Sequence, residues 1–501
     1  MSKLLKAVGF SEEKQTTVKT EIIAGLVTFL TMAYILTVNP NQILWGGVAD
    51  PRWSSVFMAT AFGAVIGTLL MAFLAKMPLA QASGMGLNAM VGSMLGGVYG
   101  AFTQSGTFAI VLISGLVFLL LSLVSIKGKT FRELVFDGMP VPVRGAISVG
   151  IGLFIAFIGF QNAGVIVTNE YTQVALVDFT NWGLQKVQWN AFIPASFAAK
   201  TASVALIGLF LIAILEKFNV KGSVIIGIIG TTLIGIPFGV TDLSVLAGDG
   251  AVTWKFWENF ANFFSAGEES VFLSFADVFS DGFGGSVFTI VMLVITFCMI
   301  DMFDTMGTIV GCCGGNRILS DENDKPYNYD KIMISDSVAT CAGAILGTST
   351  VTTFVESGSG VSAGGRTGLT ALVVAGLFFL SIFIMPVFAA IPSAATASAL
   401  IYVGVLMMKN NIKAIDFSNS INAISAFLTI VIMPLAYSIT DGIGIGLVVY
   451  TVLSLVCYGI EWIIYSVKKS EDSVKPVFPV SIVSIVVTAL FLVYFFVPAV
   501  I

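Results

Sequence analysis

The chain has 501 residues, of which 56% are hydrophobic and only 11% are charged, and its mean hydropathy is +0.96. Soluble domains carry about a quarter charged residues, so this composition excludes an ordinary soluble protein and indicates a chain that crosses a membrane many times. The formal net charge is -5 and no run of Lys and Arg occurs. Nucleic-acid binding is therefore excluded, because neutralising phosphates requires clustered basic side chains.

The chain contains five cysteines without CxxC spacing and no histidine. Such a set predicts neither a disulfide framework nor a zinc site, and we expect no metal and no cofactor. Because histidine is the usual proton carrier near neutral pH, proton chemistry here must use carboxylates. Residues 1–19 lack the apolar core and cleavage site of a secretory signal, so we expect membrane insertion to begin with the first span.

Apolar runs long enough to span a bilayer recur along the whole chain. In chain order they cover residues 22–49, 53–75, 77–126, 145–169, 201–215, 222–241, 282–311, 337–355 continuing past Glu356, 367–408, 417–440 and 442–460. Since the runs at 77–126, 337–355 and 367–408 each provide two spans, they predict fourteen spans, seven on each side of an acidic loop. Residues 476–501 form one more apolar segment, which is either a fifteenth span or an interfacial helix.

The basic residues predict the orientation of these spans. With the N-terminus in the cytoplasm, only Arg52, Lys186, Lys200 and Lys255 of the 24 Lys and Arg residues fall on the outer side, as the positive-inside rule requires. The loop of residues 238–284 is acidic and has Lys255 as its single basic residue. We therefore expect a multi-pass protein of the plasma (cytoplasmic) membrane with a cytoplasmic N-terminus.

Two spans at matching positions of the two halves have irregular starts. The third opens with Pro78–Asn88 and the tenth with Thr348–Gly360, both polar or β-prone and followed by glycines. Irregular backbone survives in a membrane only where protein or a water-filled cavity satisfies its polar groups. Each stretch is predicted to be a short extended segment followed by a half-helix whose free N–H groups favour electron-rich ligands. Glycines that only permit close helix packing are the alternative, but packing explains neither the Thr/Ser run nor Glu356.

Four acids lie within or at the ends of predicted spans, where carboxylates are costly and usually functional. They are Asp301 and Asp304 on the eighth span, Asp336 at the start of the ninth, and Glu356 on the tenth. Asp301 and Asp304 share a helical face with Thr305 and Thr308, which should look into the protein. Asp336, near the cytoplasmic edge, is explained equally well as a helix cap or a tie between spans. For Asp301 and Glu356 a buried structural pair is the alternative.

A carboxylate at this depth has two chemical uses. Desolvation destabilises its ionised form, so that it can exchange protons near neutral pH, as a proton-coupled carrier requires. It can also accept hydrogen bonds from the N–H groups of a planar heterocycle, on whose face Phe354 could stack.

Three motifs, taken in this order, resemble one transporter family. They are Gln81–Ala89 (QASGMGLNA), Asp301–Thr308 (DMFDTMGT) and Thr350–Val361 (TVTTFVESGSGV). Together they resemble the nucleobase-cation symporters of the xanthine/uracil permease superfamily, and most closely its AzgA-like branch of adenine, guanine and hypoxanthine permeases. The resemblance covers nearly the whole chain.

The resemblance implies an all-α polytopic membrane protein with a seven-plus-seven inverted-repeat fold and short antiparallel strands in the broken third and tenth spans. Residues 1–245 would form the first repeat, 246–285 the acidic extracellular loop, 286–468 the second repeat and 469–501 the C-terminal apolar segment. A core domain of spans 1–4 and 8–11 would hold the substrate against a gate domain of spans 5–7 and 12–14. A homodimer formed by the gate domains is also implied.

The resemblance also assigns roles to single residues. Asp301 and Glu356 match the two acids that hold the base, Asn88 and Asp304 match polar positions important in the purine branch, and Asp336 matches an acid associated with transport. Xanthine and uracil carriers commonly have Asn where Ser357 stands, and uracil carriers often have histidine where Thr305 stands. These departures count against uracil and xanthine as the main substrates, and the expected specificity for adenine, guanine and hypoxanthine rests on the resemblance to the AzgA-like branch.

We therefore expect a transporter, not an enzyme, that imports a neutral purine with a proton, with sodium left open as the coupling ion. Asp301 and Glu356 would accept ring N–H groups, Asn88 and Ser357 would orient the site, and Phe354 would contact the ring. Asp304, Asp336 and Thr305 would support the site or the proton coupling. An anion carrier of the sulfate-permease-like fold and a uracil or xanthine carrier are the alternatives. An intramembrane aspartyl protease is disfavoured, because the Gly-x-Gly sequences beside Asp281 and Asp441 have the wrong order for its signature.

Overall fold

The computed structural model describes residues 3–11, 14–44, 47–96, 102–126, 129–130, 138–169, 172–180, 184–187, 191–220, 222–247, 252–264, 270–274, 277–278, 282–283, 287–313, 316, 318–320, 326–468 and 476–496. Its first-half helices are α1 Lys3–Ala7, α2 Val18–Met32, α3 Ile35–Ile43, α4 Trp53–Leu70, α5 Met85–Leu95, α6 Gln104–Leu123, α8 Val141–Asn162, α9 Ala195–Lys217, α10 Ser223–Gly235 and α11 Phe256–Phe264. Those of the second half are α13 Val287–Cys313, α14 Tyr329–Leu346, α15 Ser357–Ser362, α16 Gly368–Ser381, α17 Met385–Ala389, α18 Ser393–Asn411, α19 Ser420–Leu435, α20 Ile439–Lys468 and α21 Ile482–Phe496.

Among the described residues, eight strands accompany the helices and pair two by two. Three antiparallel pairs join neighbours in the sequence: β2 Ser125–Ile126 with β3 Lys129–Thr130, β4 Ile166–Asn169 with β5 Gln173–Leu176, and β6 Leu184–Val187 with β7 Ala191–Pro194. The fourth pair, β1 Gln81–Ser83 with β8 Val351–Thr353, joins the two halves of the chain. The short strands expected in the third and tenth spans are therefore confirmed.

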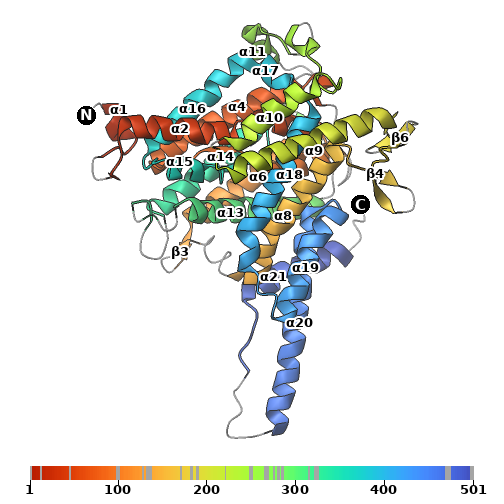
Figure 1. Cartoon of the computed structure of the whole chain (residues 1–501). Coiled ribbons are helices and arrows are strands. Elements are labelled where there is room, and N and C mark those ends of the chain that lie inside the picture. The colour runs from red at the N-terminus through yellow and green to blue at the C-terminus, as the bar shows by residue number, and fades with distance from the viewer. Residues whose placement is uncertain are drawn as a thin grey trace. The chain divides into compact units, whose positions relative to one another are not determined.

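The predicted spans are helical in the structure. Each of the fourteen contains a helix within the described residues, in the predicted order (Figure 1). Eight helical segments there are long and apolar enough to cross a membrane, and five shorter apolar helices accompany them. The protein is thus a multi-pass membrane protein. The extra C-terminal segment is the helix α21, which packs against α20.

Uncharged runs misplace some helix starts, because buried acids can lie inside a span. The ninth span was expected to begin at Asp336, but α14 begins at Tyr329 and carries the buried Asp336 in its interior. Likewise α2 begins at Val18 and includes the buried Glu21. Both carboxylates are tolerated because protein donors surround them, which the charge of a residue alone does not reveal.

The fifth span ends earlier than its apolar run. The run continues to residue 169, but α8 ends at Asn162. Gly164 follows with a φ of +67°, a left-handed conformation that stops a helix at little cost to glycine. The β-branched residues after it form the strand β4.

The contacts divide the chain into two compact units. Unit 1 comprises Met1–Ser122, Ile155–Gly285 and Phe297–Val403, and unit 2 comprises Leu123–Phe154, Ser286–Thr296 and Gly404–Ile501. In unit 2, α19 packs along α20, and Ala146, Val149 and Ala426 form a small buried cluster. The two units are defined by contact density, whereas the predicted repeats are defined by symmetry and the core and gate domains by movement. The bounds of the repeats and of these domains therefore stay predictions.

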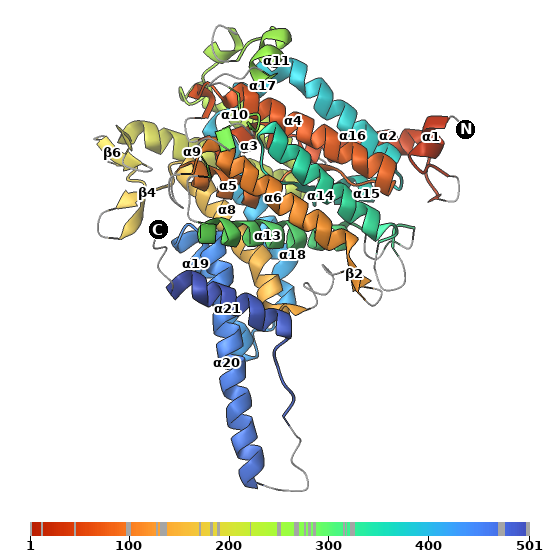
Figure 2. The same ribbon diagram turned by 180° about the vertical axis from the view of Figure 1, so that it is seen from behind.

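In unit 1, helices of the two halves of the chain are interleaved. The red and orange helices α2 and α4 lie beside the cyan α16, and α4 also lies beside the teal α14 (Figures 1 and 2). The six-residue helix α15 packs against α2. Neither half could bury these surfaces without the other.

The carboxylate of Glu21 joins α2 to the start of α16. Its oxygens accept hydrogen bonds from the backbone nitrogens of Arg366 at 2.9 Å and Thr370 at 3.2 Å, and from Thr370 Oγ1 at 2.6 Å. Backbone N–H groups in the first turn of a helix have no partner within the helix, and the dipole of the helix favours a negative charge there. Glu21 therefore caps a helix that lies more than 300 residues away in the chain.

The half-helix α5 packs closely against α3 at Gly92. A Cβ atom at Gly92 would lie 2.1 Å from the carbonyl oxygen of Gln42, a backbone atom that cannot rotate away. At Gly376, in α16, no atom of the described residues beyond that helix's own backbone lies within 4 Å of the same position.

We expect Gly92→Ala to lower the melting temperature of the detergent-solubilised protein by several degrees, because overpacking costs about 1–3 kcal/mol. The matched Gly376→Ala variant should be as stable as the wild type. Thermal unfolding followed by size-exclusion chromatography measures both. Equal melting temperatures for the two variants would show that α3 and α5 are not tightly packed.

Candidate functional site

The strand pair β1–β8 forms the frame of the candidate site. The register pairs Gln81 with Thr353, Ala82 with Thr352 and Ser83 with Val351. The pairing continues beyond the strands, since Phe354 N donates to Ala80 O at 3.0 Å and Gly84 N donates to Thr350 O at 3.0 Å. All six strand residues are buried. The two irregular stretches thus satisfy part of each other's backbone groups inside the membrane, and Thr68 Oγ1 bonds the backbone N–H and C=O of Gln81.

A short helix follows each strand. Gly84 precedes α5 and Glu356 precedes α15, and neither residue caps its helix with a side-chain hydrogen bond. The predicted arrangement of an extended segment followed by a half-helix is therefore present in both halves. The helices differ in length, with 11 residues in α5 and 6 in α15.

Asp336 is the anchor of this frame. Its carboxylate accepts hydrogen bonds from Gln81 Nε2 at 2.8 Å, Thr305 Oγ1 at 2.7 Å and Thr353 Oγ1 at 3.1 Å. The donors come from β1, α13 and β8, so one buried side chain of α14 joins three other elements. Thr305 also shares a 2.6 Å hydrogen bond with Thr352. Ionised carboxylates accept such bonds more strongly than neutral oxygens do.

Asp301 lies on the face of α13 that packs into the protein. Its side chain is 1% exposed, and its Oδ2 accepts a 2.9 Å hydrogen bond from Thr340 Oγ1 of α14. Thr305 and Thr308 on the same face are buried as well. The threonine hydroxyls thus give this helix face a polar lining.

Glu356 is held by a residue that the sequence pattern did not single out. Tyr34 lies at the break between α2 and α3, is 1% exposed, and donates a 2.6 Å hydrogen bond from its hydroxyl to Glu356 Oε1. A buried tyrosine hydroxyl needs a partner. That requirement is the signal that could have drawn attention to Tyr34 within its apolar run.

Glu356, Asp336 and Asp304 form a group of acids. Asp304 is partly buried on α13, and the charges of the other two act on it. Carboxylates that act on one another in this way repel when all are ionised. Within the described ranges, no group of three or more His, Cys, Asp and Glu side chains is arranged to hold a metal ion.

The remaining predicted site residues lie beside the strand pair β1–β8, and two of them form hydrogen bonds that support it. Asn88 accepts a hydrogen bond from Ser349 Oγ and donates to Ser83 O at 3.3 Å, which fixes its amide between the start of α5 and the segment before β8. Ser357 Oγ accepts from Ala80 N at 3.0 Å and so extends the strand ladder. Phe354 is buried directly after β8. The structure therefore brings all eight predicted residues to the surroundings of the strand pair, within unit 1.

Comparison with known proteins shows the family of this chain. Residues 19–445 match the family model Xan_ur_permease, described as a permease family. A putative permease of Methanocaldococcus jannaschii is 37% identical, over 91% of this chain and 94% of that protein. The Escherichia coli adenine permease AdeP is 35% identical, over 90% of this chain and 91% of that protein. The Bacillus subtilis guanine/hypoxanthine permease PbuO is 35% identical, over 88% of this chain and 93% of that protein.

Solved structures show the fold. The transmembrane domain of a cyanobacterial bicarbonate transporter, BicA, has a TM-score of 0.54 at 16% identity and covers 83% of this chain and 96% of that one. The murine anion transporter Slc26a9 has a TM-score of 0.53 at 11% identity, and the match covers 87% of this chain and 68% of that one. The fold is thus the seven-plus-seven inverted repeat, with its short strands in the broken spans. The strand-framed site and the match over residues 19–445 agree, and the chain belongs to the Xan_ur_permease family of permeases.

Proposed function

We propose that this protein imports purine nucleobases, namely hypoxanthine, guanine or adenine, together with a proton. Relatives at 35% identity over about nine-tenths of the chain are named adenine and guanine/hypoxanthine permeases. A substrate held between core and gate would be released inside when the core moves against the gate. On this proposal the chain is a transporter and not an enzyme.

The observation that carries the proposal is the pair of buried carboxylates beside the strand pair. Glu356 is positioned by Tyr34, and Asp301 lies on the polar face of α13. Neutral purines present N–H groups along one edge, and carboxylate oxygens are the matching acceptors. The ring of Phe354 follows β8, where it would contact the face of the base, with Asn88 and Ser357 keeping the frame around it.

Proton coupling follows from the group of acids. Moving an uncompensated negative charge through a low-dielectric region is costly. A proton bound to Glu356 or Asp301 would lower this cost as the core moves, and Asp304, Asp336 and Thr305 would shape the electrostatics around it. The proton would then leave on the cytoplasmic side with the base.

The setting of the protein is part of the proposal. The distribution of basic residues supports a cytoplasmic N-terminus in the plasma membrane. A homodimer through the gate domains follows from the family resemblance.

Uptake of labelled hypoxanthine by the purified protein in liposomes tests the function. An inward proton gradient should drive accumulation above equilibrium, and unlabelled adenine and guanine should compete better than xanthine and uracil. A sodium gradient at equal pH inside and outside is the control for the coupling ion, and should drive nothing. If folded protein takes up no nucleobase, Asp301 and Glu356 are structural residues, and an anion carrier becomes the better interpretation of the fold.

A further inference from the structure

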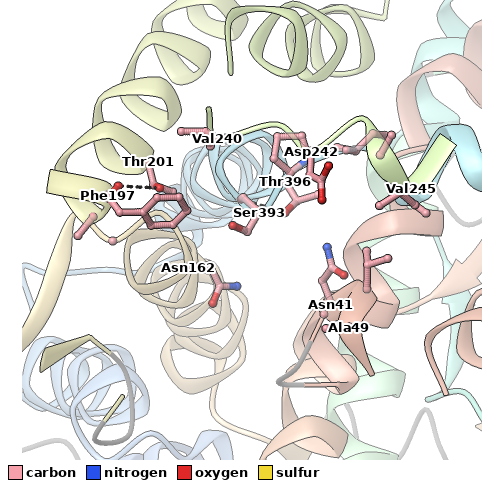
Figure 3. A pocket seen from close by; sticks show the side chains of 18 of the residues that line it. Asn41, Ala49, Asn162, Phe197, Thr201, Val240, Asp242, Val245, Ser393 and Thr396 are labelled. Carbon is pink, nitrogen blue, oxygen red and sulfur yellow. Dashed lines mark hydrogen bonds between the residues drawn. The ribbon is translucent and has the colours of Figure 1, made fainter. Parts of the chain in front are cut away.

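A cavity lined by apolar and polar side chains lies apart from the strand-framed site. It has a volume of about 630 Å³, within the range of about 300–1,000 Å³ typical of small-molecule sites. Figure 3 shows the side chains of Asn41, Asn162, Phe197, Thr201, Asp242 and Ser393 around it. They come from the end of α3, the end of α8, the start of α9, the segment after α10 and the start of α18, all of them within unit 1.

None of the eight predicted site residues lines this cavity. The helix α3 nevertheless connects the two places. Tyr34, which holds Glu356, precedes α3, and Asn41 lies seven residues further along, which is about 10 Å at 1.5 Å per residue. In the predicted topology, all the segments around the cavity lie at the outer ends of their spans.

The polar groups of the cavity include fixed donors and acceptors. Trp53 Nε1 donates a 2.8 Å hydrogen bond to Asn41 Oδ1. Because an indole N–H can only donate, this bond fixes the amide with its oxygen toward Trp53, and the Nδ2 group points into the cavity (Figure 3). The side chain of Asn162 also points into the cavity.

Asp242 supplies the complementary acceptor. Its Oδ1 accepts a 2.8 Å hydrogen bond from Ser244 N. Hydrogen bonds from the side chain and the backbone of Ser244 hold the pKa of the Asp242 carboxyl below its usual range. Asp242 is therefore ionised at neutral pH and offers only acceptor oxygens to the cavity.

An aromatic ring completes the set. Phe197, at the start of α9, is 46% exposed and lies at the cavity (Figure 3). A carboxylate acceptor, amide donors and an exposed aromatic ring match the N–H groups, the ring nitrogens or carbonyl oxygens, and the flat face of a purine. Ser393 and Thr201 also line the cavity, and the Thr201 hydroxyl donates a 3.0 Å hydrogen bond to Phe197 O.

We propose that this cavity is an outer binding site in which a purine nucleobase is held before it moves along α3 to the acids of the strand-framed site. The site rests on the proposed function, since it receives the same substrate. It selects planar bases with N–H donors through Asp242 and raises their local concentration at the entrance.

Asp242→Asn tests the recognition. The variant should raise the KM for hypoxanthine uptake about five- to tenfold, as the loss of one hydrogen bond of ordinary net strength predicts, and should change the maximal rate less than twofold. Glu258→Gln is the matched control, because Glu258 is another exposed acid of the predicted outer loop and does not line the cavity. Its KM should equal that of the wild type.

Ser393→Cys tests access to the cavity. A membrane-impermeant maleimide added outside should label Cys at this position and block uptake, and saturating hypoxanthine should slow the labelling. Lys255→Cys, exposed but outside the cavity, should label at the same rate with and without hypoxanthine and keep full uptake. Wild-type protein treated in the same way gives the background from the native thiols.

The outcomes separate the two proposals. If wild-type uptake is normal but Asp242→Asn has an unchanged KM and labelling is not slowed, the outer site is refuted and the proposed function stands. Labelling that occurs only from the inside would also refute it. If the wild type takes up no purine, both proposals fall together.

Discussion

Glu356→Gln is expected to abolish purine uptake driven by a proton gradient. The glutamine has the same shape and can keep the hydrogen bond with Tyr34, whose donor now lies 2.6 Å from Glu356 Oε1, but it can neither bind nor release a proton. Uptake of labelled hypoxanthine into liposomes at several outside pH values measures the effect. The wild type should accumulate less as the outside pH rises, whereas the variant should show no dependence on pH.

Two comparisons show whether the loss is specific to the carboxylate. Tyr34→Phe removes only the hydroxyl that positions Glu356. It should slow uptake about tenfold to a hundredfold while leaving it driven by protons, because a hydrogen bond to a charged group contributes about 1.5–3 kcal/mol. Tyr458→Phe removes a hydroxyl from α20 in unit 2 and should change nothing. Full proton-driven uptake by Glu356→Gln would refute the role given to Glu356.

The second large effect is expected at Asp336, where Asp336→Ala should strongly destabilise the protein. The substitution removes the carboxylate to which Gln81 Nε2 and the hydroxyls of Thr305 and Thr353 donate. Gln81 Nε2 keeps only a 3.3 Å bond to Thr353 Oγ1, and Thr305 keeps only its bond with Thr352. Each buried donor left unsatisfied costs about 1–3 kcal/mol. We expect a large drop in the melting temperature and in the yield of monodisperse protein, measured in detergent by size-exclusion chromatography.

The control for Asp336 lies on the same helix. Asp330 is exposed in the first turn of α14, so Asp330→Ala should cost at most about 1 kcal/mol, the contribution of an acid near a helix N-terminus. A double variant, Gln81→Glu with Asp336→Asn, exchanges the carboxylate and the amide across the same 2.8 Å contact. It should be more stable than Asp336→Asn alone. If Asp336→Ala is as stable as Asp330→Ala, the carboxylate does not hold the frame together.

The fold could be predicted from the sequence because the residue patterns that indicate it are strong. Apolar runs gave the order of the spans, and the polar, glycine-rich starts of two spans gave the strands β1 and β8 together with their half-helices. The same two stretches carry Asn88, Phe354, Glu356 and Ser357. Irregular backbone in a membrane is so constrained that a pattern of residue types is enough to locate it.

The contacts of the site were less accessible to sequence reasoning. Tyr34 lies in an apolar run, and only the three-dimensional structure shows that its hydroxyl reaches Glu356, more than 300 residues away. The burial of Asp336 within α14 was missed for a related reason. A charged residue was taken as the edge of a span, although donors from β1, β8 and α13 surround it. Pairings of this kind depend on tertiary packing, which local patterns do not encode.

The pairing of β1 with β8 also has a consequence for biogenesis. The ribosome completes β1 long before it makes β8, so the backbone groups of Ala82 that will face Thr352 have no strand partner while most of the chain is synthesised. A lone strand is poorly tolerated in lipid. The third span must therefore stay in a hydrated or protein-lined environment, and it reaches its final conformation only when the tenth span has been synthesised and β8 pairs with β1. Chains truncated before residue 351 should accordingly be recognised as incomplete and degraded, even though they already contain nine of the fourteen predicted spans.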